Sequence, residues 1–89
     1  MTEDVKKEIE WLLNLDNRSK YMFLDRMRSD CNYYLGNGHR QDKYLYGSSV
    51  ENIITYMKAL WNSFTQDEKP EWLTMEQIEA FEKEMKAEV

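Results

Sequence analysis

The sequence predicts an all-α protein, a small bundle of three main helices plus a shorter C-terminal helix. Apolar residues recur at helical spacing in four segments, and no segment shows the alternation that is typical of a β-strand. The three glycines and the single proline all fall between those segments, where a chain turns. With 89 residues, 42% hydrophobic and 33% charged, the chain has the length of a single domain, residues 1–89, and the composition of a folded globular protein.

The first helix is expected over about residues 3–15. Thr2 is a suitable N-cap, and Glu3 and Asp4 lie in the first turn, where the helix dipole favours acids. One helical face carries Val5, Ile9, Leu12 and Leu13. Trp11 lies beside that face, so we expect it to be a partly buried residue at the edge of the core.

A polar break at residues 16–19 offers three capping residues, Asp16, Asn17 and Ser19, and a second helix is expected over about residues 20–35. Its apolar face consists of Leu24, Met27, Cys31 and Leu35. Lys20 belongs to the opposite, polar face. Gly36 is expected to end the helix in the left-handed conformation, which costs glycine little.

A long loop bounded by glycines, about residues 36–47, is expected between the second and third helices. Asn37-Gly38 is a strong turn dipeptide, but its flanks do not alternate, so no hairpin is predicted. Tyr44, Leu45 and Tyr46 are costly to leave in water, so we expect them to fold back onto the helices. A short helical turn within residues 42–46 is compatible with this arrangement.

The third helix, about residues 49–64, has the most regular apolar face and is expected to be the central core helix. Ser48 and Glu51 have the spacing of a capping box at its start. The apolar face consists of Val50, Ile53, Ile54, Met57, Leu60, Trp61 and Phe64.

The fourth helix, about residues 75–87, follows a polar linker that contains Pro70. Thr74 and Gln77 have the spacing of a second capping box, and Leu73 with Ile78 predicts a hydrophobic staple. Its apolar face is thin and its outer face strongly acidic, so we expect this helix to pack along one edge of the bundle.

Charge is unevenly distributed along the chain, whose net charge is −5. Residues 18–43 carry six basic and three acidic residues, whereas residues 44–89 carry four basic and nine acidic residues. This balance excludes a general DNA-binding protein. No apolar run is long enough to span a membrane, the N-terminal residues lack the features of a signal peptide, and a single cysteine fits a reducing compartment. We therefore expect a cytoplasmic protein with no membrane partner.

Cys31 and His39 are the only cysteine and histidine of the chain, and a nucleophilic cysteine needs such a base within reach. Cys31, however, lies on the apolar face of the second helix, where a thiol is usually inert. A zinc site needs three or four ligands at a recognisable spacing, which Asp30, Cys31 and His39 lack. We therefore expect no enzymatic activity, no cofactor and no metal site.

Basic and aromatic residues in and near the long loop are the candidate binding residues, namely Arg28, Tyr33, His39, Arg40, Lys43, Tyr44 and Tyr46. Two interpretations stay open, because these side chains either pack on the bundle or present a surface. A surface of this kind suits a protein partner, or a nucleic acid through phosphate contacts and base stacking. A further alternative is an acidic mimic of DNA, with Glu71, Glu76, Glu79, Glu82 and Glu84 in place of phosphates.

Two stretches, DCNYYLGNGHRQDKYLYG at residues 30–47 and KPEWLT at residues 69–74, carry a resemblance to a known family. Together with Ile53, Met57 and Leu60 of the third helix, they resemble small domains found in large polyvalent proteins of phages and conjugative elements, and as short free-standing proteins in Firmicutes. The likeness covers roughly residues 21–85. Tyr46 departs from the family pattern, which more often has tryptophan at that position.

The resemblance implies a setting rather than a reaction, because the family brings no established catalytic residues. That setting is a mobile genetic element, with a role in protecting or processing its DNA or in countering host defence. We therefore predict a non-enzymatic interaction module that acts by protein–protein contact, as a monomer or a weak homo-oligomer.

Overall fold

The computed structural model describes residues 3–87, and this range contains four α-helices and no strand. The helices are α1 (Glu3–Leu13), α2 (Asn17–Leu35), α3 (Val50–Ser63) and α4 (Met75–Lys86). Two short 3-10 turns, η1 (Asp42–Tyr44) and η2 (Gln66–Glu68), interrupt the connections before and after α3. The prediction of a small all-α bundle is confirmed.

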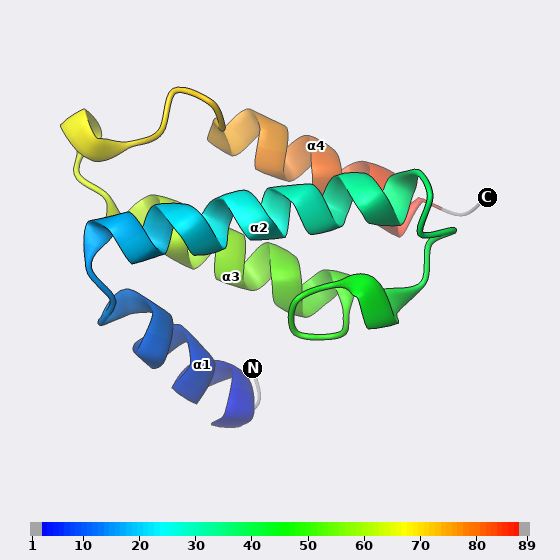
Figure 1. Ribbon diagram of the computed structural model, residues 1–89, viewed down its shortest axis with the longest axis horizontal. Coiled ribbons are helices and arrows are strands. Elements are labelled where there is room, and N and C mark those ends of the chain that lie inside the picture. The colour runs from blue at the N-terminus through cyan, green and yellow to red at the C-terminus, as the bar shows by residue number, and fades with distance from the viewer. Residues whose placement is uncertain (1–2, 88–89) are drawn as a thin grey trace.

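The helices α2, α3 and α4 lie side by side, and successive helices run in opposite directions (Figure 1). α3 is the central helix, because it packs against each of the other three. α1 and α4 lie on opposite sides of the molecule (Figure 1). The helix with the most regular apolar face in the sequence therefore takes the position with the most packing partners.

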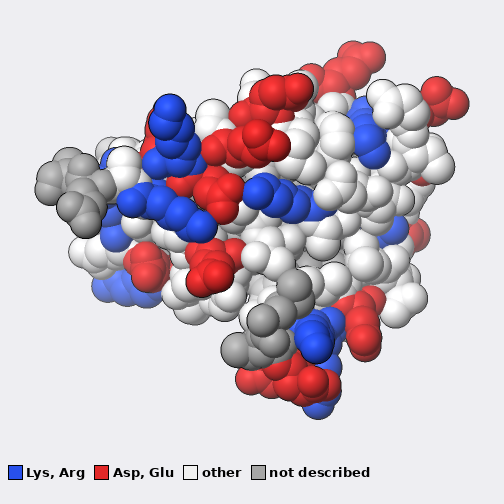
Figure 2. All heavy atoms as spheres, turned by 180° about the vertical axis from the view of Figure 1, so that it is seen from behind, with Lys and Arg blue, Asp and Glu red and all other residues white. Residues whose placement is uncertain are grey.

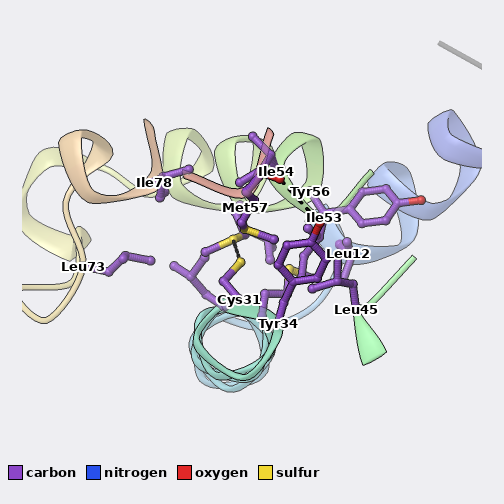
Figure 3. Packing of buried hydrophobic residues seen from close by; sticks show 14 of the residues in the cluster. Leu12, Cys31, Tyr34, Leu45, Ile53, Ile54, Tyr56, Met57, Leu73 and Ile78 are labelled. Carbon is purple, nitrogen blue, oxygen red and sulfur yellow. Dashed lines mark hydrogen bonds between the residues drawn. The ribbon is translucent and has the colours of Figure 1, made fainter. Parts of the chain in front are cut away.

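One hydrophobic cluster joins all four helices and the loop between α2 and α3 (Figure 3). Near its middle, the Cys31 and Met57 sulfur atoms lie 3.7 Å apart. Leu45 reaches the same cluster from the loop, as expected for an apolar side chain that folds back. The buried hydrophobic residues are Val5, Leu12, Leu24, Met27, Cys31, Tyr34, Leu45, Ile53, Ile54, Tyr56, Met57, Leu60, Phe64, Leu73, Ile78 and Met85.

Capping side chains set the first residues of the helices. α2 begins earlier than predicted, at Asn17, because Asp16 Oδ1 accepts the Ser19 amide at 2.8 Å, which also lowers the Asp16 pKa. Ser49, not Ser48, caps α3, so the predicted cap is wrong by one residue. Ser48 has a φ of 62°, whereas an N-cap needs extended backbone. The Thr74–Gln77 capping box of α4 is confirmed, and the expected Thr2 cap lies outside the described residues.

Three further expectations differ from the structure. Lys20 is buried rather than on a polar face, because its Nζ lies 5.8 Å from the Phe64 ring centroid and 3.4 Å from Ser63 Oγ. Trp11 is 51% exposed, and its ring is perpendicular to that of Phe23 with the centroids 5.4 Å apart. Gly36 does end α2, but with a φ of −110°, so it is not in the left-handed conformation.

None of the described helices is long and apolar enough to cross a membrane.

Candidate interaction surface

The loop after α2 turns back onto the end of that helix. The Gly38 amide donates to the Tyr33 carbonyl oxygen at 2.6 Å, and the Arg40 amide donates to the Tyr34 carbonyl oxygen at 2.9 Å. Gly38 is buried, and a Cβ at this position would lie 2.8 Å from the Tyr33 carbonyl oxygen. Glycine is therefore required for the turn to close, and the position of the following residues is fixed relative to α2.

Arg40, predicted as a binding residue, holds the end of α4. Its Nη1 lies 3.2 Å from the carbonyl oxygen of Glu84 and 3.4 Å from that of Ala87. Glu84 lies in the last turn of α4 and Ala87 is the C-cap residue, so both carbonyls are at the helix C-terminus, where the dipole favours a cation. Half-buried Arg40 thus joins the loop to a helix more than forty residues away in the chain.

Tyr46, another predicted binding residue, fixes the second half of the loop to the bundle. Its amide donates to Asp30 Oδ2 at 3.1 Å, and its hydroxyl donates to Glu8 Oε1 on α1. Its ring meets the rings of Phe23 and Tyr56 edge-on, with centroids 5.9 Å and 5.7 Å apart. Burial, followed by the Glu8 carboxylate, raises the pKa of Tyr46. Tyr46 therefore contributes to packing and is not free to bind a partner through its hydroxyl.

Tyr33 and Tyr44 remain at the surface, 44% and 41% exposed. Their rings meet edge-on with centroids 5.1 Å apart, and Lys43 Nζ lies 5.3 Å from the Tyr44 ring centroid. We call these three residues, Tyr33, Lys43 and Tyr44, the loop face. His39 is also exposed in the same loop, with a φ of 53°. The predicted surface is thus reduced to an aromatic pair with one cation beside it.

Arg28 lies at a different place, in a groove between α2 and α4. Its guanidinium lies 4.9 Å from the Trp72 ring centroid, and Nη2 is 2.6 Å from Asp25 Oδ1. The groove has a volume of about 330 Å³ and is floored by Leu73 and Phe81. Sequence reasoning missed the pairing of Trp72 with Arg28.

Comparison with known protein families gives one matching family. The profile of large polyvalent protein-associated domain 11 matches residues 17–85, which is most of the chain. The chain belongs to this family. The resemblance seen in the sequence is therefore confirmed, and membership suggests a domain associated with mobile genetic elements. Neither the curated proteins nor the solved structures gave a match.

The domain 11 match begins at the first residue of α2, so α1 lies outside it. Within the match, several residues on which the sequence resemblance rested make contacts that hold the loop and the helices together. Asp30 accepts the Tyr46 amide, and Arg40 caps α4. Gly47 has a φ of 83°, and a Cβ there would lie 2.7 Å from the Tyr56 ring. Many residues of the sequence pattern therefore stabilise the fold, whereas the loop face is exposed, as are Glu71 and Trp72 of the second stretch.

Cys31 of this domain 11 protein is fully buried, on the core side of α2. Burial, and secondarily the charge of Asp30, raises the pKa of the Cys31 thiol to about 12. His39 lies in the exposed loop. Over residues 3–87, no three potential metal-ligating residues come together.

Acidic and basic side chains are interspersed on the face opposite to that of Figure 1 (Figure 2). Glu82 of α4, one of the carboxylates in the DNA-mimic hypothesis, forms ion pairs with Lys58 at 2.9 Å and Lys86 at 3.0 Å. Hydrogen bonds from both lysines lower the pKa of Glu82. This mixed arrangement differs from the continuous negative surface that a mimic of DNA needs.

Proposed function

We propose that this domain is a non-enzymatic interaction module of a mobile genetic element, which acts in the host cytoplasm by binding a protein through the loop face. The observation that carries the proposal is the exposed pair of Tyr33, on the last turn of α2, and Tyr44, on the loop whose backbone is fixed to α2. Exposed aromatic rings on a rigid support are typical of residues that dominate binding energy at protein interfaces.

The contacts of the other candidate residues support this narrower surface. Arg40 and Tyr46 are engaged with α4 and α1, and Arg28 is engaged with Asp25 and Trp72. Lys43 has no ion pair within the part of the chain that the structure describes. A partner that covers the two tyrosines therefore also meets a cation that is available for pairing, which favours an acidic rim on the partner.

Affinity capture with matched variants tests the proposal. Tyr44→Ala and Tyr33→Ala are compared with Trp11→Ala as immobilised baits in lysate of cells that carry the element. Trp11 is a suitable control, because it is also an exposed aromatic residue that meets one other ring edge-on. We expect the tyrosine variants to retain at least fivefold less of the captured protein and Trp11→Ala to match the unaltered domain. Equal capture by all four baits would contradict the proposal.

Nucleic-acid binding is a second candidate, which the Lys43–Tyr44 pair favours, because a cation beside an exposed ring can meet a phosphate and a base. It has less support than protein contact, since Arg28 and Arg40 are engaged elsewhere. A gel-shift titration at low salt with single- and double-stranded DNA and RNA tests it. We expect no shift at tens of micromolar protein; a shift abolished by Lys43→Ala and by added salt would favour this candidate instead.

A further inference from the structure

A hollow of about 440 Å³ lies between α1, the end of the loop and the start of α3. Its volume falls within the range of ligand sites, roughly 300–1,000 Å³. Part of its wall comes from α1, which lies outside the domain 11 match, and the rest comes from residues within the match. It is lined by Asp4, Val5, Glu8, Tyr46, Gly47, Asn52 and Tyr56.

Two carboxylates in this hollow have no cationic partner within residues 3–87. Asp4 and Glu8 stand one helical turn apart on α1, and neither forms an ion pair among the described residues. Glu8 accepts a hydrogen bond from the Tyr46 hydroxyl, which leaves further acceptor capacity on both carboxylates. Arg26, the cation near this site, lies 5.8 Å from the Tyr46 ring centroid and contacts the ring rather than a carboxylate.

Tyr56 supplies an independent sign of a ligand. Its side chain is 96% buried by residue, with 4% exposed, yet no described residue is a hydrogen-bond partner of its hydroxyl. Figure 3 shows its ring directed away from the sulfur atoms of the core and toward α1, with the hydroxyl at the outer end. Burial, and then the charges of Glu8 and Asp4, raises the pKa of Tyr56, as expected for a hydroxyl near both carboxylates. No described side-chain nitrogen or oxygen atom is both buried and unpaired, so the Tyr56 oxygen opens onto the hollow, where it can donate or accept a hydrogen bond.

We propose that this hollow receives a cationic side chain, arginine or lysine, of the protein partner. Guanidinium or ammonium donors suit Glu8, Asp4 and the Tyr56 oxygen, because charge-assisted hydrogen bonds to carboxylates are short and strong. The rings of Tyr46 and Tyr56 meet at 80° and offer apolar walls for the aliphatic stem. A hard metal ion fits less well, since it needs more oxygen ligands than two carboxylates provide. The inference rests on the proposed function, because it names the chemistry of that partner.

Titration of the ¹⁵N-labelled domain by NMR tests the inference with Nα-acetyl-arginine amide, Nα-acetyl-lysine amide and Nα-acetyl-citrulline amide. Citrulline has the shape of arginine without its charge. We expect the amide signals of Glu8, Gly47 and Asn52 to move with at least one cationic probe, at a dissociation constant on the order of millimolar for a single side chain. Citrulline should bind at least tenfold more weakly. The comparison of arginine with lysine identifies the preferred cation.

Three variants sharpen the test. Glu8→Gln keeps an acceptor for the Tyr46 hydroxyl but removes the charge, and should weaken binding of the cationic probe at least fivefold. Asp4→Asn, at an exposed position, should weaken it without endangering the fold. Glu10→Gln is the matched control, an exposed acid on α1 outside the hollow, and should change binding less than twofold.

Equal binding of citrulline and arginine, signal changes confined to other regions, or unchanged binding by folded Glu8→Gln and Asp4→Asn would each overturn the inference. Failure here is distinguishable from failure of the proposed function. The cationic probes can fail to bind while Tyr44→Ala still loses the captured protein. That result would support partner binding by the loop face and refute cation binding by the hollow.

Discussion

Replacing Arg40 by alanine tests whether this side chain stabilises the end of α4. Hydrogen bonds from a charged donor contribute about 1.5–3 kcal/mol, and a cation at a helix C-terminus about 0.3–1 kcal/mol. Arg40 is only half-buried, and its two contacts, 3.2 and 3.4 Å, are long for charged donors, so the lower end of these ranges applies. We expect Arg40→Ala to lower the free energy of unfolding by about 1–1.5 kcal/mol.

The backbone conformation of Arg40 allows two further variants to test the same capping role. Arg40 has a φ of 59°, a conformation that costs a non-glycine residue roughly 1 kcal/mol. Arg40→Gly loses the same guanidinium but relieves that cost, so it should be less destabilised than Arg40→Ala. Arg40→Lys keeps the charge with a single ammonium group, so its stability should lie between those of the unaltered domain and Arg40→Ala.

Urea unfolding followed by circular dichroism at 222 nm measures these differences. For a domain of this size, a slope near 1 kcal/mol per molar urea converts the expected loss into a midpoint lowered by about 1–1.5 M. An Arg40→Ala midpoint within about 0.2 M of the unaltered domain would refute the capping role. Arg40 would then be available to a partner, as the sequence suggested.

Three further outcomes follow from the packing. Gly47→Ala should lower the free energy of unfolding by about 2 kcal/mol or more in urea, because the new Cβ meets the Tyr56 ring at a positive φ; an unchanged midpoint would contradict this. Tyr46→Phe should cost about 1 kcal/mol, measured in the same way, through loss of the hydrogen bond to Glu8, and no loss would show that this bond adds nothing. Cys31 has a pKa raised from 9.0 to about 12, so its contribution is fully present below pH 9 and is lost as the pH rises toward 12. Relative to Cys31→Ala, the unaltered domain should therefore lose about 2 kcal/mol of stability between pH 8 and pH 10.5, and parallel pH profiles of the two proteins would contradict the burial of the thiol.

The helices could be predicted because their apolar residues recur at helical spacing, and α3 has the most regular pattern. Their first residues were less predictable. Ser48 and Ser49 are chemically identical candidates for a cap, and only the backbone conformation, extended at Ser49 and left-handed at Ser48, selects one. The burial of Lys20 could not be predicted from local sequence either. The residues that cover it, Ser63 and Phe64, lie more than forty positions away, at the end of α3.

The candidate site was predicted as one stretch of basic and aromatic residues, and the structure separates it into parts. Arg28 contacts Trp72 near the start of α4, and Arg40 contacts the end of α4. Both contacts join residues more than forty positions apart, which no local pattern reveals. Leu45 was expected to fold back and does, because burial of a leucine is favourable wherever a core is within reach. The hollow beside Tyr56 depends on how α1 packs and left no sign in the sequence.

Photocrosslinking from the loop face tests the central claim most directly. A benzoylphenylalanine residue replaces Tyr44 in one protein and Trp11 in another, in cells that carry the element, and adducts larger than the 10.8 kDa domain are detected after irradiation. If the loop face contacts a protein partner, position 44 yields a discrete adduct and position 11 does not. An adduct from position 11 with none from position 44 would contradict the claim, as would the absence of any adduct from position 44.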